Sequence, residues 1–199
     1  MATWFENWYD RLMLPLEKRR LGAIRRSIIQ QAQGKVLELG SGTGLNFPYY
    51  SGVEEVAAVE PSAAMREQSQ ERASKARVPI TIVAAQGEQL PFADNTFDTA
   101  VVTLVLCSVT SPEQTLQELR RVCKPSGKIL LFEHVRLAHP MLGKLQDVLT
   151  PAWRQAFDGC HLNREPIKLL EKAGLRVHNV TGVYKNLFLI VEAGSGKDS

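Results

Sequence analysis

The sequence predicts an α/β fold built on a largely parallel sheet. Between about residues 35 and 135, short apolar and β-branched runs alternate with segments of helical periodicity, which is typical of βαβ units. Several of these runs are almost entirely apolar, as strands are when helices cover both faces of a sheet. Near the end of the chain, two more strand-like runs are joined by a short turn, and such a connection requires antiparallel pairing. We therefore expect a parallel sheet that ends in a hairpin.

The elements follow one another with recognisable ends. Ser62 is placed to cap a helix from Ala63 to about Ala76, and Ser111 followed by Pro112 opens a second helix that stops near Gly127. A further helix is expected around 45–50. The predicted strands are 35–40, 55–60, 80–85, 99–106, 128–135, 176–183 and 185–193, with an insertion at 136–165 that is helical in pieces and a helix at 165–173.

Length and composition indicate one globular domain. The chain has 199 residues, of which 44% are hydrophobic and 23% charged, and this excludes a disordered protein. No apolar run reaches the ~18 residues of a membrane-spanning helix, and the start of the chain does not resemble a secretory signal. The three cysteines are odd in number and widely spaced, which argues against a disulfide scaffold, predicts no metal site, and favours a reducing compartment.

Charge is uneven along the chain. The net charge of +3 is too small to predict a nucleic-acid binder. All of the excess lies in residues 1–33, which also carry Trp4, Phe5, Trp8 and Tyr9. We expect three units: an N-terminal helical lid or surface segment (1–33), a main domain (34–194) that includes the insertion, and a frayed tail (195–199).

The most informative motif is a glycine turn that directly follows the first predicted strand. It reads Glu38-Leu39-Gly40-Ser41-Gly42-Thr43-Gly44, and glycines at alternate positions let main-chain amides approach a ligand closely. The second strand ends at Glu60, where a carboxylate can accept hydrogen bonds from both ribose hydroxyls. The spacing departs from the dinucleotide pattern GxGxxG. Glu38 would suit an ammonium group better than a diphosphate, or it organises the loop.

Together these motifs resemble a class I S-adenosylmethionine-dependent methyltransferase. The resemblance rests on ELGSGTG, Glu60, GEQLPFADNTFD (87–98) and KPSGKILLFEHV (124–135), and covers residues 35–192. It implies a three-layer Rossmann-like fold with a seven-stranded sheet in the order 3-2-1-4-5-7-6 and strand 7 antiparallel. It also implies S-adenosyl-L-methionine as methyl donor and S-adenosyl-L-homocysteine as product.

The resemblance assigns cofactor roles residue by residue. The glycine turn would contact the methionine part, Glu60 the ribose, and Met65 the adenine face, while Gln86 stands where the family often has an aspartate. Thr103 would contact the donor from the end of the fourth strand. The full set of candidate cofactor-binding residues is Tyr9, Glu38, Gly40, Ser41, Gly42, Gly44, Glu60, Met65, Gln86, Gly87, Glu88 and Thr103.

A narrower likeness concerns the acceptor. TLVLCSV (103–109), FEHV (132–135) and PAWRQAFDGCHLNRE (151–165) resemble the methyltransferase-like 7 group of alkyl-thiol methyltransferases. A thiol attacks as its thiolate, so a nearby base would help, and the candidates are His134, Asp158 and His161. Both histidines can instead be structural, and Cys107 is expected to be a buried, inert thiol rather than a catalytic one.

The expected function is therefore methyl transfer to a small hydrophobic acceptor, most simply a thiol. A C- or N-methyltransferase for a quinone or phospholipid precursor is the alternative within this class. An NAD-binding oxidoreductase and a non-catalytic cofactor-binding module are the alternatives outside it. We expect a cytoplasmic protein. Residues 1–30 form a lid over the site with Tyr9 inside it, contact an anionic membrane, or simply pack on the sheet, and the hydrophobic anchor of the animal members is not expected.

Overall fold

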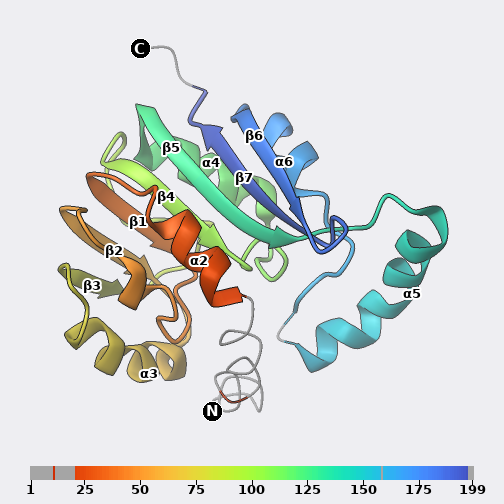
Figure 1. Ribbon diagram of the computed structural model, residues 1–199, viewed down its shortest axis with the longest axis horizontal. Coiled ribbons are helices and arrows are strands. Elements are labelled where there is room, and N and C mark those ends of the chain that lie inside the picture. The colour runs from red at the N-terminus through yellow and green to blue at the C-terminus, as the bar shows by residue number, and fades with distance from the viewer. Residues whose placement is uncertain (1–10, 12–20, 158, 197–199) are drawn as a thin grey trace.

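The computed structural model describes residues 11, 21–157 and 159–196 of the chain. In this part, seven strands form one sheet in the order β3-β2-β1-β4-β5-β7-β6 (Figure 1). The strands are β1 (Lys35–Leu39), β2 (Glu55–Val59), β3 (Ile80–Val83), β4 (Phe97–Thr103), β5 (Cys123–His134), β6 (Arg176–Val183) and β7 (Phe188–Gly194). Strands β1 to β5 are parallel, and β7 runs antiparallel to both β5 and β6. This order and these directions confirm the predicted fold.

Helices cover both faces of the sheet and complete the three layers (Figure 1). Helices α2 (Gly22–Ile29) and α3 (Ala63–Ser74) lie on one face, and α4 (Pro112–Val122) and α6 (Pro166–Lys172) lie on the other. Helix α5 (Pro140–Ala156) extends away from the sheet edge (Figure 1). No helix in the described part of the chain is long and apolar enough to cross a membrane.

The predicted helix starts are confirmed by their caps. Ser62 accepts a hydrogen bond from the Met65 amide, and Ser111 accepts one from the Gln114 amide, with Pro112 at the first position of α4. Each cap satisfies an amide that has no partner within its own helix.

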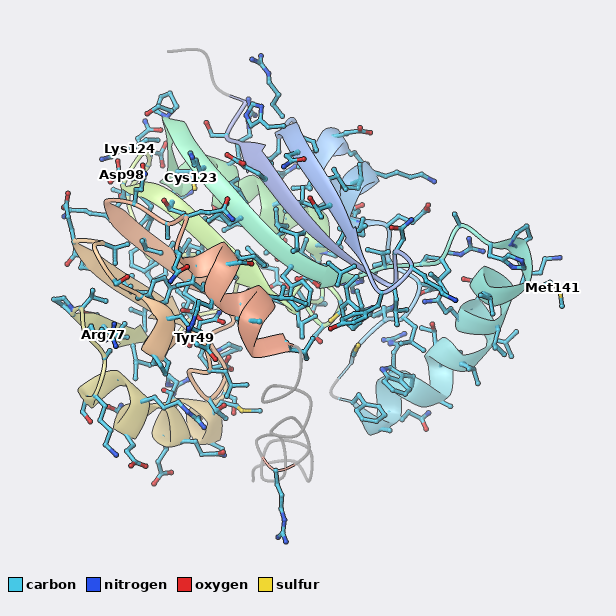
Figure 2. All side chains as sticks on the ribbon, in the orientation of Figure 1. Tyr49, Arg77, Asp98, Cys123, Lys124 and Met141 are labelled. Carbon is cyan, nitrogen blue, oxygen red and sulfur yellow. The ribbon has the colours of Figure 1, made fainter. Side chains whose placement is uncertain are left out.

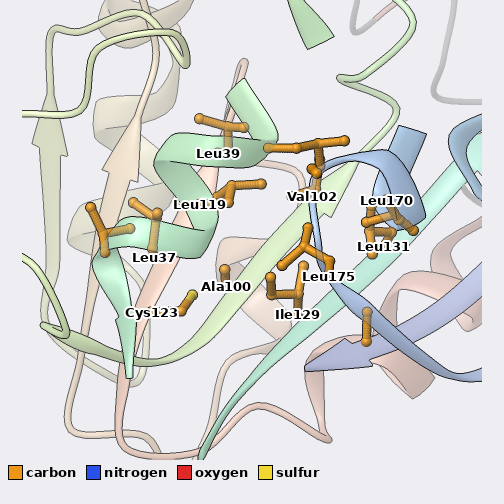
Figure 3. Close-up of a cluster of buried hydrophobic side chains, with 14 of the residues drawn as sticks. Leu37, Leu39, Ala100, Val102, Leu119, Cys123, Ile129, Leu131, Leu170 and Leu175 are labelled. Atoms are coloured by element: carbon orange, nitrogen blue, oxygen red, sulfur yellow. The ribbon is translucent and has the colours of Figure 1, made fainter. Parts of the chain in front are cut away.

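Side-chain alternation along the strands separates two buried clusters. On β1, Leu37 and Leu39 face the α4 side, whereas Val36 belongs to the cluster under α2. Figure 3 shows the first cluster, where Leu119 of α4 packs over these strands. Since successive residues of a strand point to opposite faces, the polar Glu38 is placed on the α2 side.

Two helix predictions differ from the structure. The expected helix at 45–50 is only a 3₁₀ helix, η2 (Phe47–Tyr49), because the backbone becomes extended at Tyr50 (φ −66°, ψ 130°) and the helix ends there. The insertion was expected to be helical in pieces, yet α5 is one 17-residue helix that contains Pro151. An interior proline costs a helix about 3 kcal/mol but need not end it. The hydroxyl of Thr150 donates to the Gln146 carbonyl in the same turn.

The edges of the fold carry two further features. Met141 and Val148 of α5 are each 76% exposed, and Figure 2 shows Met141 on the side of α5 turned away from the sheet. Ser195, which the sequence places in a frayed tail, is fully buried, and its hydroxyl donates to the Pro125 carbonyl. The described chain therefore continues past β7, and this contact ties its end to the first residues of β5.

Candidate functional site

The main cavity of the described structure lies where the parallel strands end. It has a volume of about 340 Å³ and is bounded by the turns after β1, β2 and β4. Ligands of open α/β sheets bind at this edge, near the point where the strand order reverses. Nine of the predicted cofactor-binding residues line the cavity: Gly40, Ser41, Gly42, Glu60, Met65, Gln86, Gly87, Glu88 and Thr103.

The glycine turn owes its shape to three residues with left-handed backbone angles. Gly40, Gly42 and Gly44 have φ values of 62°, 55° and 80°. A β-carbon on Gly40 would lie 2.5 Å from a Val105 methyl group, whereas nothing lies within 4 Å of the corresponding position on Gly42. Gly42 therefore leaves open space above the turn. Gly44 does not line the cavity and instead packs against the Phe47 ring.

Glu60 links the glycine turn to the end of β2. Its carboxylate accepts a hydrogen bond from the Gly42 amide at 2.9 Å and another from the Ser62 amide at 2.8 Å. Each carboxylate oxygen can accept more than one hydrogen bond, and Glu60 lines the cavity. The same two bonds hold the turn and the start of α3 in fixed positions.

The adenine-side candidates come from the start of α3 and from the segment after β3. Met65 is buried at the start of α3, and Gln86 pairs with Gln89 in an isolated bridge. Space at Gly87 is tight, because a β-carbon there would lie 3.0 Å from the Thr115 methyl group, which would have to shift. The Glu88 carboxylate accepts the Ser111 amide, which ties this wall to the start of α4.

A buried polar network lies beneath the cavity on the α2 side of the sheet. The Arg25 guanidinium donates to Asn46 Oδ1 at 3.1 Å and to Thr103 Oγ1 at 3.0 Å. The Asn46 amide donates to Glu38 Oε1 and to Thr103 Oγ1, each at 3.0 Å. All four residues are less than 9% exposed, so these bonds form in a region of low polarity.

This network shows what sequence reasoning missed. Arg25 and Asn46 both line the cavity, but neither was predicted. Asn46 could have been found by its position just after the glycine turn, whereas Arg25 is one of several basic residues in the N-terminal segment and carries no distinguishing signal. Glu38 does not line the cavity, and its contacts match the interpretation in which it organises the loop.

Burial dominates the electrostatics of Glu38. It raises the pKa of the Glu38 carboxyl to about 7, although the nearby Tyr50 hydroxyl, the Asn46 amide and the Arg25 charge each act in the opposite direction. Burial and the neighbouring Glu38 carboxylate also raise the pKa of Tyr50 well above its usual value. Burial thus weakens the acidity of a carboxyl group that three polar neighbours help to hold in place.

The end of β4 makes a sharp turn into the cavity wall. Leu104 has a φ of 59°, which is rare for a residue with a branched side chain and occurs often at functional sites. The turn brings the Val105 and Leu106 amides onto Glu133 Oε1 of β5, at 2.7 and 2.9 Å. Val105 packs against Gly40. The two loops are therefore held together as one wall.

Of the candidate bases, His134 and His161 are described, and neither lines the cavity. His134 Nε2 lies 3.1 Å from Cys160 Sγ, and the His161 amide donates to the Cys107 carbonyl. Burial lowers the pKa of His161, and the charges of Arg164 and Arg154 add to this effect. Asp158 and Tyr9, which were also predicted, lie outside the described residues. The roles of the two histidines and Asp158 as bases, and of Tyr9 as a cofactor contact, therefore stay predictions.

The cavity fits an adenosyl sulfonium compound. Open space above Gly42 gives main-chain amides access to a ligand, and the buried hydroxyl of Ser41 has no partner among the described residues. Glu60 supplies acceptors for hydroxyl groups, Met65 supplies an apolar surface, and Arg25 brings a positive charge. A ligand with a sugar, a flat base and a charged amino-acid end uses all of these features.

Comparison with known proteins agrees with this geometry. A family model described as a methyltransferase domain matches residues 37–131. The chain is 41% identical over 142 residues to thiol S-methyltransferase TMT1B of Rattus norvegicus, which covers 69% of this chain and 58% of the relative. It is also 33% identical over 124 residues to a demethylmenaquinone methyltransferase of Paenarthrobacter aurescens, covering 62% of this chain and 43% of that protein.

Solved structures share the fold at low sequence identity. A chain from the complex of the Haloferax volcanii Trm112 methyltransferase activator with a methyltransferase matches at a TM-score of 0.76 and 15% identity, covering 99% of this chain and 100% of that one. The [4+2]-cyclase SpnF matches at 0.70 and 16%, covering 88% and 79%. Since one of these neighbours is named for a cyclisation, the fold by itself does not determine the reaction.

The family is nevertheless clear from sequence. Thiol S-methyltransferase TMT1B of Homo sapiens is 35% identical over 174 residues, which cover 81% of this chain and 71% of that protein. The chain spans 58% of the rat relative's length, so it is compared with part of that protein. From the matched methyltransferase domain and this relative, the chain belongs to the methyltransferase family that includes thiol S-methyltransferase TMT1B.

Proposed function

We propose that this protein transfers a methyl group from S-adenosylmethionine to a small hydrophobic thiol. The observation that carries the proposal is the cavity in which the Gly40–Gly44 turn and Glu60 meet at 2.9 Å, at the carboxyl ends of β1 and β2. The rat and human relatives are both named thiol S-methyltransferases, which supports a thiol as the acceptor.

The donor supplies a methyl group on a positively charged sulfur, and the residues of the chain bind and orient it. Glu60 is fixed by two amides and faces the ribose hydroxyls. Met65 packs on the base, and Gln86 offers an acceptor to its amino group. Arg25 suits the carboxylate of the amino-acid end. Alignment of two bound reactants is the main requirement of an in-line displacement, so fixed walls are what this chemistry needs.

Other acceptors are compatible with the same donor site. The likeness to a demethylmenaquinone methyltransferase favours a quinone as the second candidate, but it covers 43% of that protein. An NAD-binding oxidoreductase is disfavoured because the third glycine comes one residue early, and a binding module without turnover would share the cavity.

An acceptor panel tests the proposal. Release of S-adenosylhomocysteine is measured with alkyl thiols, phenols, amines and a quinol. We expect turnover with hydrophobic thiols. Methylation of the quinol without turnover of any thiol would overturn the acceptor assignment, and absence of turnover with all classes would favour the binding module.

Calorimetry tests the donor site separately. S-adenosylhomocysteine is expected to bind, whereas NAD is not. Glu60→Gln should weaken S-adenosylhomocysteine binding by about 10- to 100-fold, since a hydrogen bond to a charged group is worth about 1.5–3 kcal/mol. Tight NAD binding, or unchanged affinity in the variant, would count against this site.

We also propose that the protein is cytoplasmic and contacts anionic membranes peripherally through residues 1–30. The basic cluster Lys18, Arg19 and Arg20 beside an aromatic-rich stretch supports this idea. Deletion of all 30 residues would remove Ile28 and Ile29 from the core, so charge reversal of the cluster is the better variant. If the natural protein and the charge-reversed variant sediment equally with phosphatidylserine vesicles, the membrane contact is contradicted.

A further inference from the structure

Two cysteines and a histidine meet next to the donor cavity. Cys107 lies in the loop after β4, His134 ends β5, and Cys160 follows α5. Their ligand atoms all lie within 4.8 Å of one another, and His134 Nε2 is 3.1 Å from Cys160 Sγ. In the described part of the chain, these three residues form the group of histidine, cysteine or carboxylate side chains whose ligand atoms are close enough to hold a metal ion.

The two loops that carry the sulfurs are tied together around them. The His161 amide donates to the Cys107 carbonyl at 2.8 Å, and the Cys160 amide donates to the Phe157 carbonyl at 2.9 Å. The Arg164 guanidinium donates to the carbonyls of Leu106 and Val109, on either side of Cys107. The positions of the sulfurs are therefore set by main-chain contacts, as in a preorganised site.

The donor set fits zinc. Two thiolates and an imidazole are ligands that Zn²⁺ prefers, at about 2.3 Å for sulfur and 2.0–2.1 Å for nitrogen. Around such an ion, ligand atoms lie about 3.5–4 Å apart, so small movements of the side chains would bring this group to ligand distances. Two thiolates balance the charge of the ion. The Arg164 guanidinium and the buried Glu133 carboxyl group also lie close to the sulfurs.

We propose that Cys107, His134 and Cys160 bind one Zn²⁺ ion whose fourth position receives the sulfur of the acceptor. Structural zinc sites use four protein ligands, whereas catalytic sites use three and leave one position for water or substrate. The described residues supply three. The proposal rests on the proposed function for the identity of the acceptor.

The position of the site explains what it would do. Cys107 Sγ lies 3.5 Å from the hydroxyl oxygen of Ser108, and Ser108 lines the donor cavity. A thiol that binds the ion loses its proton to solvent, and its sulfur uses one lone pair for the zinc–sulfur bond. A free thiol has a pKa of about 8.5 and is about 3% ionised at pH 7, so coordination provides the thiolate that methyl transfer needs.

Metal content of the full-length chain is the first test. The protein is purified with a reductant and without chelators, and zinc is measured by mass spectrometry. We expect one ion per chain, with strong loss in Cys107→Ser, His134→Asn and Cys160→Ser. Cys123→Ala is the matched control, because Cys123 is also buried but lies outside the group. If the natural protein holds no zinc even after incubation with Zn²⁺, or if all variants hold the same amount of zinc, the proposal is overturned.

Cobalt substitution tests the open position. Co²⁺ bound to two sulfurs and one nitrogen should give thiolate-to-metal charge-transfer bands and intense visible bands, and these should shift when an alkyl thiol is added without any methyl donor. A spectrum that is insensitive to the thiol would refute the acceptor position. A Cys107–Cys160 disulfide that persists in protein purified with the reductant would refute the metal site and indicate a redox pair.

Binding of S-adenosylhomocysteine separates this proposal from the proposed function. The ligand-site variants should retain that affinity, which also shows that they fold, while thiol methylation at pH 7 falls by about 30-fold, the loss expected when a thiol returns to its free pKa. Zinc binding with no methyl transfer to any acceptor would refute the function and leave the metal site standing. Full thiol methylation by the zinc-free protein would refute the role of the ion.

Discussion

At the scale of single residues, Gly40 and Gly42 share a left-handed backbone but differ in what a side chain would meet. Both residues pay the backbone cost of about 1–2 kcal/mol when replaced by alanine. At Gly40 the new methyl group would also lie 2.5 Å from Val105, whereas at Gly42 it would enter open space. The left-handed backbone alone accounts for a glycine at position 42, whereas position 40 also requires glycine because Val105 of the neighbouring loop packs against it.

We therefore predict different effects for the two substitutions. Gly40→Ala should lower the free energy of unfolding by about 2–4 kcal/mol, and Gly42→Ala by about 1–2 kcal/mol. Gly42→Ala should still weaken S-adenosylhomocysteine binding, because its methyl group enters the cavity. Urea unfolding and calorimetry measure the two quantities. Equal destabilisation by both substitutions would show that Val105 gives way easily.

Glu38 makes the stability of the protein depend on pH. The pKa of its carboxyl is about 7 in the folded chain, against 4.5 as its ordinary value, so the folded state binds more protons between these values. Its contribution to stability is therefore fully present below pH 4.5 and is lost as the pH rises through 7. From pH 5 to pH 8 the loss amounts to about 2–3 kcal/mol.

Glu38→Gln removes this titration and keeps an oxygen that accepts from Asn46. From pH 5 to pH 8, the natural protein should therefore lose about 2–3 kcal/mol of unfolding free energy relative to the variant. All other titrating groups are common to both proteins and cancel. Parallel curves from pH 5 to pH 8, measured by urea unfolding, would contradict a raised pKa at Glu38.

At the scale of elements, the role predicted for the N-terminal segment differs from the role that the structure gives to α2. The sequence placed residues 1–33 in a lid or surface segment, and the aromatic residues that suggested a lid lie outside the described part. The described helix α2 buries Ile28 and Ile29 and sends Arg25 to the cavity wall. Periodicity predicts a buried face, but it does not say which basic residue of a cluster points inward, because that depends on how the helix is seated on the sheet.

We predict that Arg25 couples α2 to the donor site. Arg25→Met leaves Asn46 Oδ1 and Thr103 Oγ1 without this donor, and loss of a buried charged partner costs about 2–4 kcal/mol of unfolding free energy. Binding of S-adenosylhomocysteine should weaken as well. Arg26→Met is the control, since Arg26 is exposed and stacks over the Tyr49 ring at 5.6 Å. Similar losses in both variants would show that the effect is not specific to the network.

At the scale of the whole molecule, the topology and the cavity wall were predictable, and the side-chain convergence behind the wall was not. Apolar runs, caps and glycine spacing are local signals, and together with the family resemblance they predicted the strand order and most of the residues that line the cavity. The hydrogen bond from the Gly42 amide to Glu60 was not predicted. Cys107, His134 and Cys160 come from three distant segments, and no spacing rule connects them. The loops that bring them together depend on Arg164 and on the path of α5, which the sequence predicted as irregular.

The donor site joins the turn after β1, the end of β2, α2 and the end of β4, so a ligand there should stabilise the whole molecule. At 100 times its dissociation constant, S-adenosylhomocysteine adds about 2.7 kcal/mol to the free energy of unfolding. For a chain of this size, that corresponds to a rise in Tm of about 5–10 °C. NAD at the same concentration is the control. We expect no rise in Tm with NAD, because the third glycine of the turn comes one residue earlier than in the GxGxxG pattern that binds a diphosphate. Scanning calorimetry measures both, and an equal rise with NAD would mean that the cavity recognises a nucleotide without distinguishing a sulfonium from a diphosphate.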